Sequence, residues 1–248
     1  KNLLTFNPEF LREGSAISDF FNPDRIVIGG LSSEKIDKLK KLYKGYDAEV
    51  VITDPISSQL IKYLANTYLP LRLSFVNEAT RLSEYSGANL TDVLKGVGLD
   101  SRIGSHYFRP SPSWGGSCFP KDLVEVNNFY NQDDLNLPLI SNIIGSNQEH
   151  LNWTINQLLS LKKNNALKRI VLVGAAFKED TDDLRNSPTL DIYNILNEME
   201  EEVIILDTEI EVPNYQSVKQ LDGVPSNSLL SIMYPLKEEL NKNISNYA

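Results

Sequence analysis

The stretches that decide the fold at the start of the chain are Arg25-Ile-Val-Ile-Gly-Gly30 and Glu49-Val-Val-Ile52. Between them, Ser33 to Tyr43 carries a polar helical pattern, and before them Leu3 to Phe6 is a further short apolar run. A helix between two apolar strands predicts a βαβ unit, because parallel neighbours in a sheet need a crossover connection. The sequence therefore predicts an α/β fold that begins with a strand, a short helical turn, a strand, a helix and a strand.

A long helix is predicted to follow. Asp54 is a good N-cap, Pro55 suits the first helical position, and the stretch up to Tyr85 places a wide apolar face on one side of a helix. Pro70 lies inside this stretch and predicts a kink. Further helical patterns cover Thr91 to Gly96, Lys121 to Tyr130 and Pro138 to Leu161. The middle of the chain is therefore predicted to be all-helical.

A second βαβ unit is predicted near the end. Arg169 to Gly174 is an apolar strand, a helix runs from Ser187-Pro188 to about Met199, and Glu202 to Asp207 contains another strand. Beyond it only Asn227 to Met233 has a strand-like pattern. We expect three parts: residues 1–53, the end of a Rossmann-like domain; 54–160, a helical domain; and 161–248, an incomplete Rossmann-like domain.

Composition restricts the function. The 248 residues hold 24 Lys and Arg against 33 Asp and Glu, a net charge of −9, which argues against a nucleic-acid binder. No apolar run approaches the roughly 20 residues that span a bilayer. The single cysteine excludes an internal disulfide and favours a cytoplasmic protein. His106 and His150 have no acidic residue at ligand spacing, so we expect neither a metal site nor a Ser-His-Asp triad.

The glycine fingerprint of dinucleotide binding, G-x-G-x-x-G, is absent. Gly96 and Gly98 lack a third glycine and follow a helix, and the turn after Val173 has a single glycine. We therefore expect any group that grips a dinucleotide pyrophosphate to lie outside this sequence. Because this part is missing, we expect a fragment that by itself is inactive and binds the dinucleotide weakly. The chain begins at Lys1 and not at Met, so we also expect trimmed ends.

The sharpest local motif is Trp114-Gly-Gly-Ser-Cys-Phe-Pro-Lys-Asp122. Pro120 suits the first turn of a helix, which places Cys118 where free backbone N–H groups favour a thiolate. The glycines would let a substrate approach the sulfur, and Lys121 adds positive charge. A lone cysteine is more often a small buried apolar residue, but these polar surroundings favour a nucleophile.

Lys62 and Asn66 form a second candidate pair, because residues four apart stack on one face of a helix. Together they could clamp a developing oxyanion. A solvated helix lysine is the more ordinary interpretation. In Asn7 to Gly14, a helical turn would leave Glu9 and Glu13 on one side, either for chemistry or only to complement the helix dipole.

The loop Gly174 to Arg185 is a fourth candidate, because the carboxyl end of a strand is where α/β sheets bind ligands. Lys178 and Arg185 lie in it among four acidic residues. A charged surface loop is the alternative.

Taken together and in order, five segments resemble the nucleotide-sugar 6-dehydrogenases of the UDP-glucose/GDP-mannose dehydrogenase family, most of all its UDP-glucose members. The segments are Asn7 to Gly14, Lys62 to Thr67, Arg102 to Gly104, Gly115 to Asp122, and Phe177-Lys178 with Arg185. The resemblance runs to about residue 210. It implies oxidation of a sugar C6 alcohol to a carboxylate, with two NADH formed from NAD per sugar. The apolar face of the long helix is wider than a single packing partner needs, which predicts a homodimer built through this helix.

The resemblance also implies residue roles. Cys118 would hold the C6 aldehyde as a thiohemiacetal and then as a thioester. Lys62 and Asn66 would stabilise charge on the C6 oxygen, with Lys62 also an acid or base, and Asp122 and Glu9 would handle the hydrolytic water. The implied substrate contacts are Phe10, Leu11, Arg12, Tyr107, Phe108, Arg109, Ser111, Gly115, Phe177, Lys178 and, across a dimer interface, Arg102. The implied cofactor contacts are Glu13, Lys121 and Arg185.

Three features depart from the family pattern. The glycine-rich turn is missing, Ser113-Trp114 stands where the family has Gly-Tyr or Gly-Phe, and Met233-Tyr234-Pro235 stands where an arginine-bearing segment is expected. Two alternatives stay open: a GDP-mannose 6-dehydrogenase, and a noncatalytic dimeric remnant that only binds a nucleotide sugar. Retention of Cys118 together with Lys62, Asn66 and Asp122 argues against the remnant.

Overall fold

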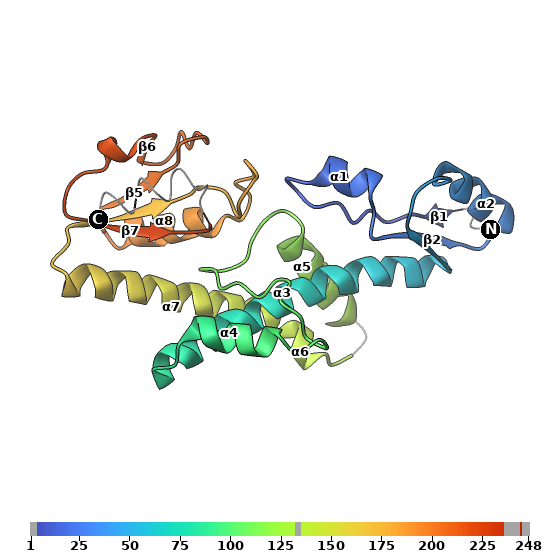
Figure 1. The fold of residues 1–248 in the computed structure, drawn as a ribbon, viewed down its shortest axis with the longest axis horizontal. Helices are drawn as coiled ribbons and strands as arrows, with labels where there is room; N and C mark the ends of the chain where they lie inside the picture. The colour runs from blue at the N-terminus through green and yellow to red at the C-terminus, as the bar shows by residue number, and fades with distance from the viewer. Residues whose placement is uncertain (1–3, 132–134, 236–243, 245–248) are drawn as a thin grey trace. The chain divides into compact units, whose positions relative to one another are not determined.

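The computed structural model describes residues 4–131, 135–235 and 244. The chain divides into two compact units, Lys1–Tyr68 and Leu69–Ala248. The division falls within α3 (Pro55–Ser86), which is one continuous helix with Pro70 inside it (Figure 1). Each unit is described by itself below.

The first unit contains a three-stranded sheet in the order β1-β2-β3. The strands are β1 (Thr5–Phe6), β2 (Arg25–Gly30) and β3 (Glu49–Thr53), and α2 (Ser33–Leu42) connects the last two. The pair β2 and β3 is parallel, so the predicted βαβ unit is confirmed, whereas β1 is antiparallel to β2. Leu4 lies outside β1, and Leu3, which the sequence also assigned to a strand, lies outside the described residues.

The start of α3 packs closely against β2. Asp54 caps the helix as predicted, because its Oδ1 accepts hydrogen bonds from the backbone N–H groups of Ile56 at 2.9 Å and Ser57 at 3.0 Å. A Cβ atom at Gly29 would lie 2.0 Å from Ser58 Oγ, so only glycine permits this approach.

The described residues of the middle section form helices and contain no strand, as predicted. The helices are α3, α4 (Leu90–Gly98), α5 (Phe119–Asn131), α6 (Pro138–Ser141) and α7 (Ile143–Asn164). The prediction of a single helix from Pro138 to Leu161 is wrong, because the helix is interrupted at Asn142. The Asn142 side chain donates a hydrogen bond to the Pro138 carbonyl at 2.6 Å, and such local bonds compete with a continuous helix.

A second sheet, in the order β6-β5-β4-β7 with every pair parallel, forms the end of the chain (Figure 1). Its elements are β4 (Arg169–Val173), α8 (Pro188–Glu198), β5 (Val203–Leu206), β6 (Ser217–Val218), the short 3-10 helix η1 (Leu221–Gly223) and β7 (Ser228–Ile232). The second βαβ unit and β7 are confirmed. The sequence missed β6, since two residues are too short for a periodic signal. Residues 170–173 of β4 are fully buried, with apolar clusters on both faces of the sheet.

The carboxyl end of β4 turns sharply at Gly174, whose φ is +100°. A Cβ atom there would lie 2.6 Å from the Tyr234 ring. Burial, followed by the nearby charge of Asp207, raises the pKa of Tyr234 to about 12. The Tyr234 side chain is therefore a packed, neutral part of this turn.

Gly174→Ala is expected to lower the free energy of unfolding by roughly 3 kcal/mol, because it combines a left-handed backbone with a clash against an aromatic ring. Gly145→Ala is the matched control, since Gly145 lies in α7 with nothing within 4 Å of an added Cβ. The control is expected to gain up to about 1 kcal/mol from helix propensity. Urea unfolding followed by circular dichroism measures both, and equal midpoints would contradict the account.

Candidate active site

The segment before α1 (Ala16–Phe21) has no helical turn, so the turn predicted between Asn7 and Gly14 is wrong. Two groups that a helix would require are engaged elsewhere. The Asn7 amide donates to the Val27 carbonyl at 2.8 Å and so does not cap a helix, and the Glu9 carbonyl accepts from Lys62 Nζ at 2.7 Å. The dipole interpretation of the two glutamates therefore fails.

Lys62 is held against the segment that carries Glu9. Its Nζ lies 2.8 Å from Glu9 Oε1, and its side chain is 20% exposed. The Leu11 N–H donates to the other Glu9 oxygen at 2.7 Å, and the Phe10 ring centroid lies 5.4 Å from Nζ. The alternative of a solvated helix lysine is therefore wrong. Asn66, one turn further along α3, is buried.

Other residues expected near the ligand in the first unit have protein partners. The Arg25 guanidinium stacks on Phe10 at 3.8 Å. Arg12 pairs with Asp19 at 2.5 Å, and its hydrogen bonds hold the pKa of the Asp19 carboxyl well below its usual range. Arg12 thus fixes the segment onto α1. Glu13 lies in the turn just before α1, ahead of Gly14 with its φ of +83°.

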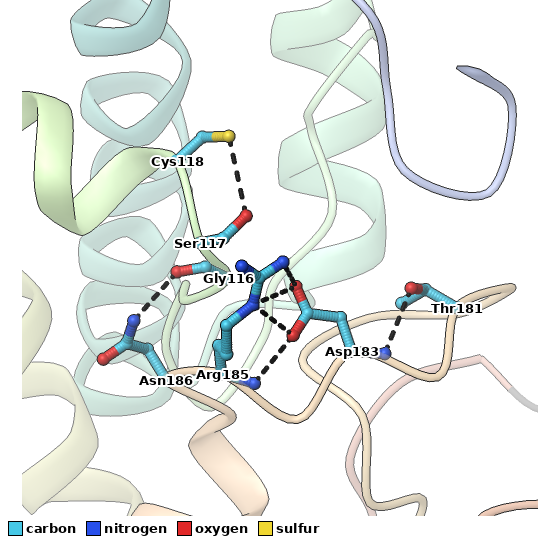
Figure 2. A network of polar contacts seen from close by, with 7 residues as sticks. All are labelled: Gly116, Ser117, Cys118, Thr181, Asp183, Arg185 and Asn186. Carbon is cyan, nitrogen blue, oxygen red and sulfur yellow. Dashed lines mark hydrogen bonds and ion pairs between the residues drawn. The ribbon is translucent and has the colours of Figure 1, made fainter.

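In the second unit, Cys118 lies immediately before α5, as predicted. Its carbonyl accepts the N–H of Asp122 at 2.9 Å, and its side chain is exposed. Its Sγ lies 3.6 Å from Ser117 Oγ (Figure 2). Asp122 is buried one turn further on, with Oδ1 3.7 Å from the exposed Lys121 Nζ. The structure therefore has an exposed thiol at the N-terminus of α5 and a buried carboxylate one turn further along the same helix.

The glycines before Cys118 do not leave open space, which corrects the expectation drawn from the sequence. A Cβ atom at Gly115 would lie 1.8 Å from the Asn186 carbonyl oxygen, and one at Gly116 would lie 2.8 Å from the Phe177 ring. Asn186 also donates a hydrogen bond to the Gly116 carbonyl at 3.0 Å (Figure 2). The segment from Trp114 to Cys118 is named the cysteine loop. Its two glycines let it pack directly against the loop that follows β4.

The segment before Trp114 is anchored by buried polar side chains that the sequence analysis missed. The Ser111 N–H donates to Asn77 Oδ1 on α3 at 3.0 Å, and its carbonyl lies 3.0 Å from His150 Nε2 on α7. The Trp114 indole N–H donates to Ser74 on α3 at 2.9 Å. These hydrogen bonds join residues that are 34 to 40 positions apart, so no local pattern in the sequence indicated them.

Three arginines that the resemblance implies as ligand contacts have carboxylate partners. Arg109 lies 3.1 Å from Glu179, and Arg185 lies 2.8 Å from Asp183 (Figure 2). Arg102 pairs locally with Asp100 at 2.6 Å. Lys178 Nζ lies 5.6 Å from the centroid of the adjacent Phe177 ring.

Two more features bear on ligand binding in this unit. Tyr107 has a φ of +56°, and Phe108 packs near Phe75 at 6.4 Å between ring centroids. A cavity of about 310 Å³ lies beside the expected contacts Phe108 and Arg109 but does not include Cys118. Its lining is Leu90, Thr91, Leu94, Lys95, Ser105, Phe108, Arg109 and Pro110.

The structure thus brings the expected residues together in two groups. Glu9, Phe10 and Lys62 are in contact within the first unit. Within the second, the Gly115 to Cys118 segment meets the loop that carries Phe177. Within residues 4–131, 135–235 and 244, no cluster of three or more His, Cys, Asp or Glu could hold a metal ion.

Comparison with known proteins assigns this arrangement to a family. Residues 2–47 match the NAD binding domain of the UDP-glucose/GDP-mannose dehydrogenase family, 56–149 its central domain, and 171–240 its UDP binding domain. The chain belongs to the UDP-glucose/GDP-mannose dehydrogenase family. The boundaries at residues 53 and 160 stay a prediction.

Individual members of the family support this assignment. UDP-glucose 6-dehydrogenase of Rickettsia felis is 40% identical over 194 residues, which are 77% of this chain and 43% of that protein. UDP-glucose 6-dehydrogenase TuaD of Bacillus subtilis is 37% identical over 78% of this chain and 42% of its own length. This chain therefore spans less than half of either relative.

A solved structure agrees. The UDP-glucose dehydrogenase of Pyrobaculum islandicum is 33% identical, with a TM-score of 0.83 over 93% of this chain and 56% of that one. The α/β family fold with a helical middle section is therefore confirmed.

His150 is expected to make the free energy of unfolding of this chain fall at acidic pH. Burial lowers the pKa of His150 to about 4, while an unfolded histidine titrates near 6.5. Between these values the unfolded chain binds a proton that the folded chain does not, so stability is complete above about pH 6.5 and falls as the pH drops toward 4.

The test is His150→Gln, whose amide can take the place of Nε2 toward Ser111. Between pH 7.5 and 4.5 the wild-type chain is expected to lose roughly 2 kcal/mol more stability than the variant. Urea unfolding at each pH measures the free energy of unfolding of both proteins. Groups other than His150 titrate alike in both, so their effects cancel in the difference between wild type and variant. Parallel stability curves would show that His150 does not carry the effect.

Proposed function

We propose that the protein carrying this chain oxidises C6 of UDP-glucose to the carboxylate of UDP-glucuronate. The observation that carries the proposal is the exposed thiol of Cys118 directly before α5, with Asp122 buried one turn behind it. The relatives named UDP-glucose 6-dehydrogenase favour this substrate over GDP-mannose.

NAD is the proposed oxidant and, when bound, would supply the acceptor for one hydride from the sugar carbon in each oxidation. Gly29 and Gly30 do not supply a cradle for its pyrophosphate. The space beside Gly29 is filled by Ser58, and a Cβ atom at Gly30 would lie 3.0 Å from Ile36. We propose only Glu13, Lys121 and Arg185 as cofactor contacts from this chain.

The chain's own residues carry the covalent chemistry. The Cys118 thiolate adds to the C6 aldehyde left by the first oxidation, which gives a thiohemiacetal that cannot escape. Its oxidation leaves a thioester, and water then breaks the carbon–sulfur bond to give the carboxylate and the free thiol. Asp122 and Glu9 are the proposed groups that accept protons from this water.

Lys62 is the proposed partner of the C6 oxygen, together with Asn66. Its pairing with Glu9 keeps the ammonium and a carboxylate within 2.8 Å, so a proton released at C6 has an acceptor nearby. The amide of Asn66 would add a neutral donor to the oxygen.

The substrate is a nucleoside diphosphate sugar, so basic and aromatic groups are proposed to bind it. The proposed contacts are Phe10, Leu11, Arg12, Arg102, Tyr107, Phe108, Arg109, Ser111, Gly115, Phe177 and Lys178. Arg109 would exchange Glu179 for a phosphate, which is inexpensive because both side chains are exposed.

We place the enzyme in the cytoplasm, where a lone thiol stays reduced. No helix within the described part of the chain has both the length and the apolar character needed to cross a membrane.

The test uses the full-length protein that carries this sequence, incubated with NAD and either UDP-glucose or GDP-mannose. Two NADH per UDP-glucose are expected, and Cys118→Ala is expected to abolish acid formation because no thioester can form. Two NADH per GDP-mannose would show that the protein is a GDP-mannose 6-dehydrogenase instead. No NADH with either sugar would indicate a noncatalytic remnant that only binds a nucleotide sugar. Full activity of Cys118→Ala would rule out the mechanism through a thioester at Cys118.

A homodimer through α3 is proposed as well. Seven large apolar side chains are exposed on this one helix, and at 100° per residue they fall on one face. They are Ile56, Leu60, Leu64, Tyr68, Phe75, Leu82 and Tyr85. A continuous apolar stripe of this kind suits a two-fold contact with a second copy.

Leu82→Glu is expected to convert the dimer to a monomer, because Leu82 is 67% exposed and a charge there would be buried in the interface. Glu84→Lys, an exposed position on the opposite face of α3, is the control for a change of charge and is expected to remain dimeric. Sedimentation velocity measures both. A dimer that survives Leu82→Glu unchanged would remove α3 from the interface.

A further inference from the structure

Asn147 on α7 binds both backbone polar groups of one residue in the cysteine loop. Its Oδ1 accepts a hydrogen bond from the Trp114 N–H at 2.9 Å, and its Nδ2 donates to the Trp114 carbonyl at 2.9 Å. A primary amide offers one acceptor and one donor group side by side, so it can match a peptide backbone as a neighbouring strand does. The pairing therefore fixes both the position and the orientation of the backbone at Trp114.

Trp114 is one of the fixed points of the segment that leads to the thiol. Gly115 and Gly116 follow it, and the Gly116 carbonyl accepts a hydrogen bond from Asn186 at 3.0 Å. On the far side of the segment, Cys118 is tied to α5 through its carbonyl. The direction of the Cys118 side chain thus depends on three anchors: the backbone of Trp114, the Gly116 carbonyl and the start of α5.

We propose that Asn147 is a positioning residue, which sets where the Cys118 thiol lies by fixing the backbone of Trp114. This inference rests on the proposed role of Cys118 as nucleophile. The bond from the Trp114 indole to Ser74 holds only the side chain and cannot replace the amide contact. Without Asn147, two backbone groups of a residue that is 7% exposed lose these partners.

The first experiment measures the alkylation of the chain by iodoacetamide between pH 6 and 10. The chain has one cysteine, so the rate reports Cys118 alone. The variants are Asn147→Ala, Asn147→Asp, which keeps the shape but replaces the donor with an acceptor, and the control Asn156→Ala on the exposed face of α7. An unstructured cysteine peptide gives the reference profile.

We expect the wild-type chain and Asn156→Ala to share a pH–rate profile that differs from the peptide's. Both Asn147 variants are expected to move toward the peptide by roughly threefold in rate or more, with circular dichroism unchanged. A lower melting temperature with an unmoved profile, loss of folding in both variants, or a wild-type profile equal to the peptide's would each overturn the proposal.

The second experiment separates this inference from the proposed function. In the full-length protein, Asn147→Ala is expected to lower kcat by roughly tenfold or more with KM for UDP-glucose within about twofold, because misplacement of a nucleophile slows the chemistry and not binding. An unchanged kcat would overturn positioning. If UDP-glucose is not turned over at all, the proposed function fails, while the alkylation result still decides the role of Asn147.

Discussion

The close approach of two loops at Gly115 is the constraint on which the second unit depends. No side chain fits there, since a Cβ atom would lie 1.8 Å from the Asn186 carbonyl oxygen. The loop after β4 is itself fixed at both ends, because Ser187 Oγ donates to the Ala175 carbonyl at 2.6 Å and Thr189 Oγ1 to the Gly174 carbonyl at 2.7 Å. The position of the cysteine loop is therefore coupled to the parallel sheet, and the glycines are a packing requirement of the fold.

Charge pairing is the feature that would let an acidic chain present arginines to the proposed nucleotide ligands. Two of the arginines proposed to meet a ligand, one in the loop after β4 and one that pairs with it, each have a carboxylate neighbour. The pairs are Arg109 with Glu179 and Arg185 with Asp183. These arginines are 63% and 68% exposed, so each pair contributes little to stability and a phosphate can compete for the guanidinium. The pairing of Lys62 with Glu9 differs, because that lysine is mostly buried and the pair holds two segments together.

Local patterns predicted the elements, and long-range contacts decided what they could not. Both βαβ units, the capped start of α3 and the place of Cys118 before α5 follow from period, cap and proline signals within a few residues. The segment after Asn7 was misassigned because its polar groups bond to Val27 and Lys62, which lie far along the chain. The two hydrogen bonds between Asn147 and the Trp114 backbone could not be predicted from the sequence for the same reason. Hydrogen-bond partners tens of residues away leave no periodic trace.

Ser113-Trp114 departs from the Gly-Tyr or Gly-Phe expected from the resemblance, and the structure accommodates the larger side chain. An indole is larger than a phenyl ring and brings an N–H that must be satisfied when buried. Here the N–H reaches Ser74 at 2.9 Å, and the ring packs in a cluster with Leu123 and Ile143. The change is thus accommodated on the α3 and α5 side of Trp114. The backbone contact with Asn147 is independent of the side chain, so the cysteine loop can keep its course while the residue that anchors it varies.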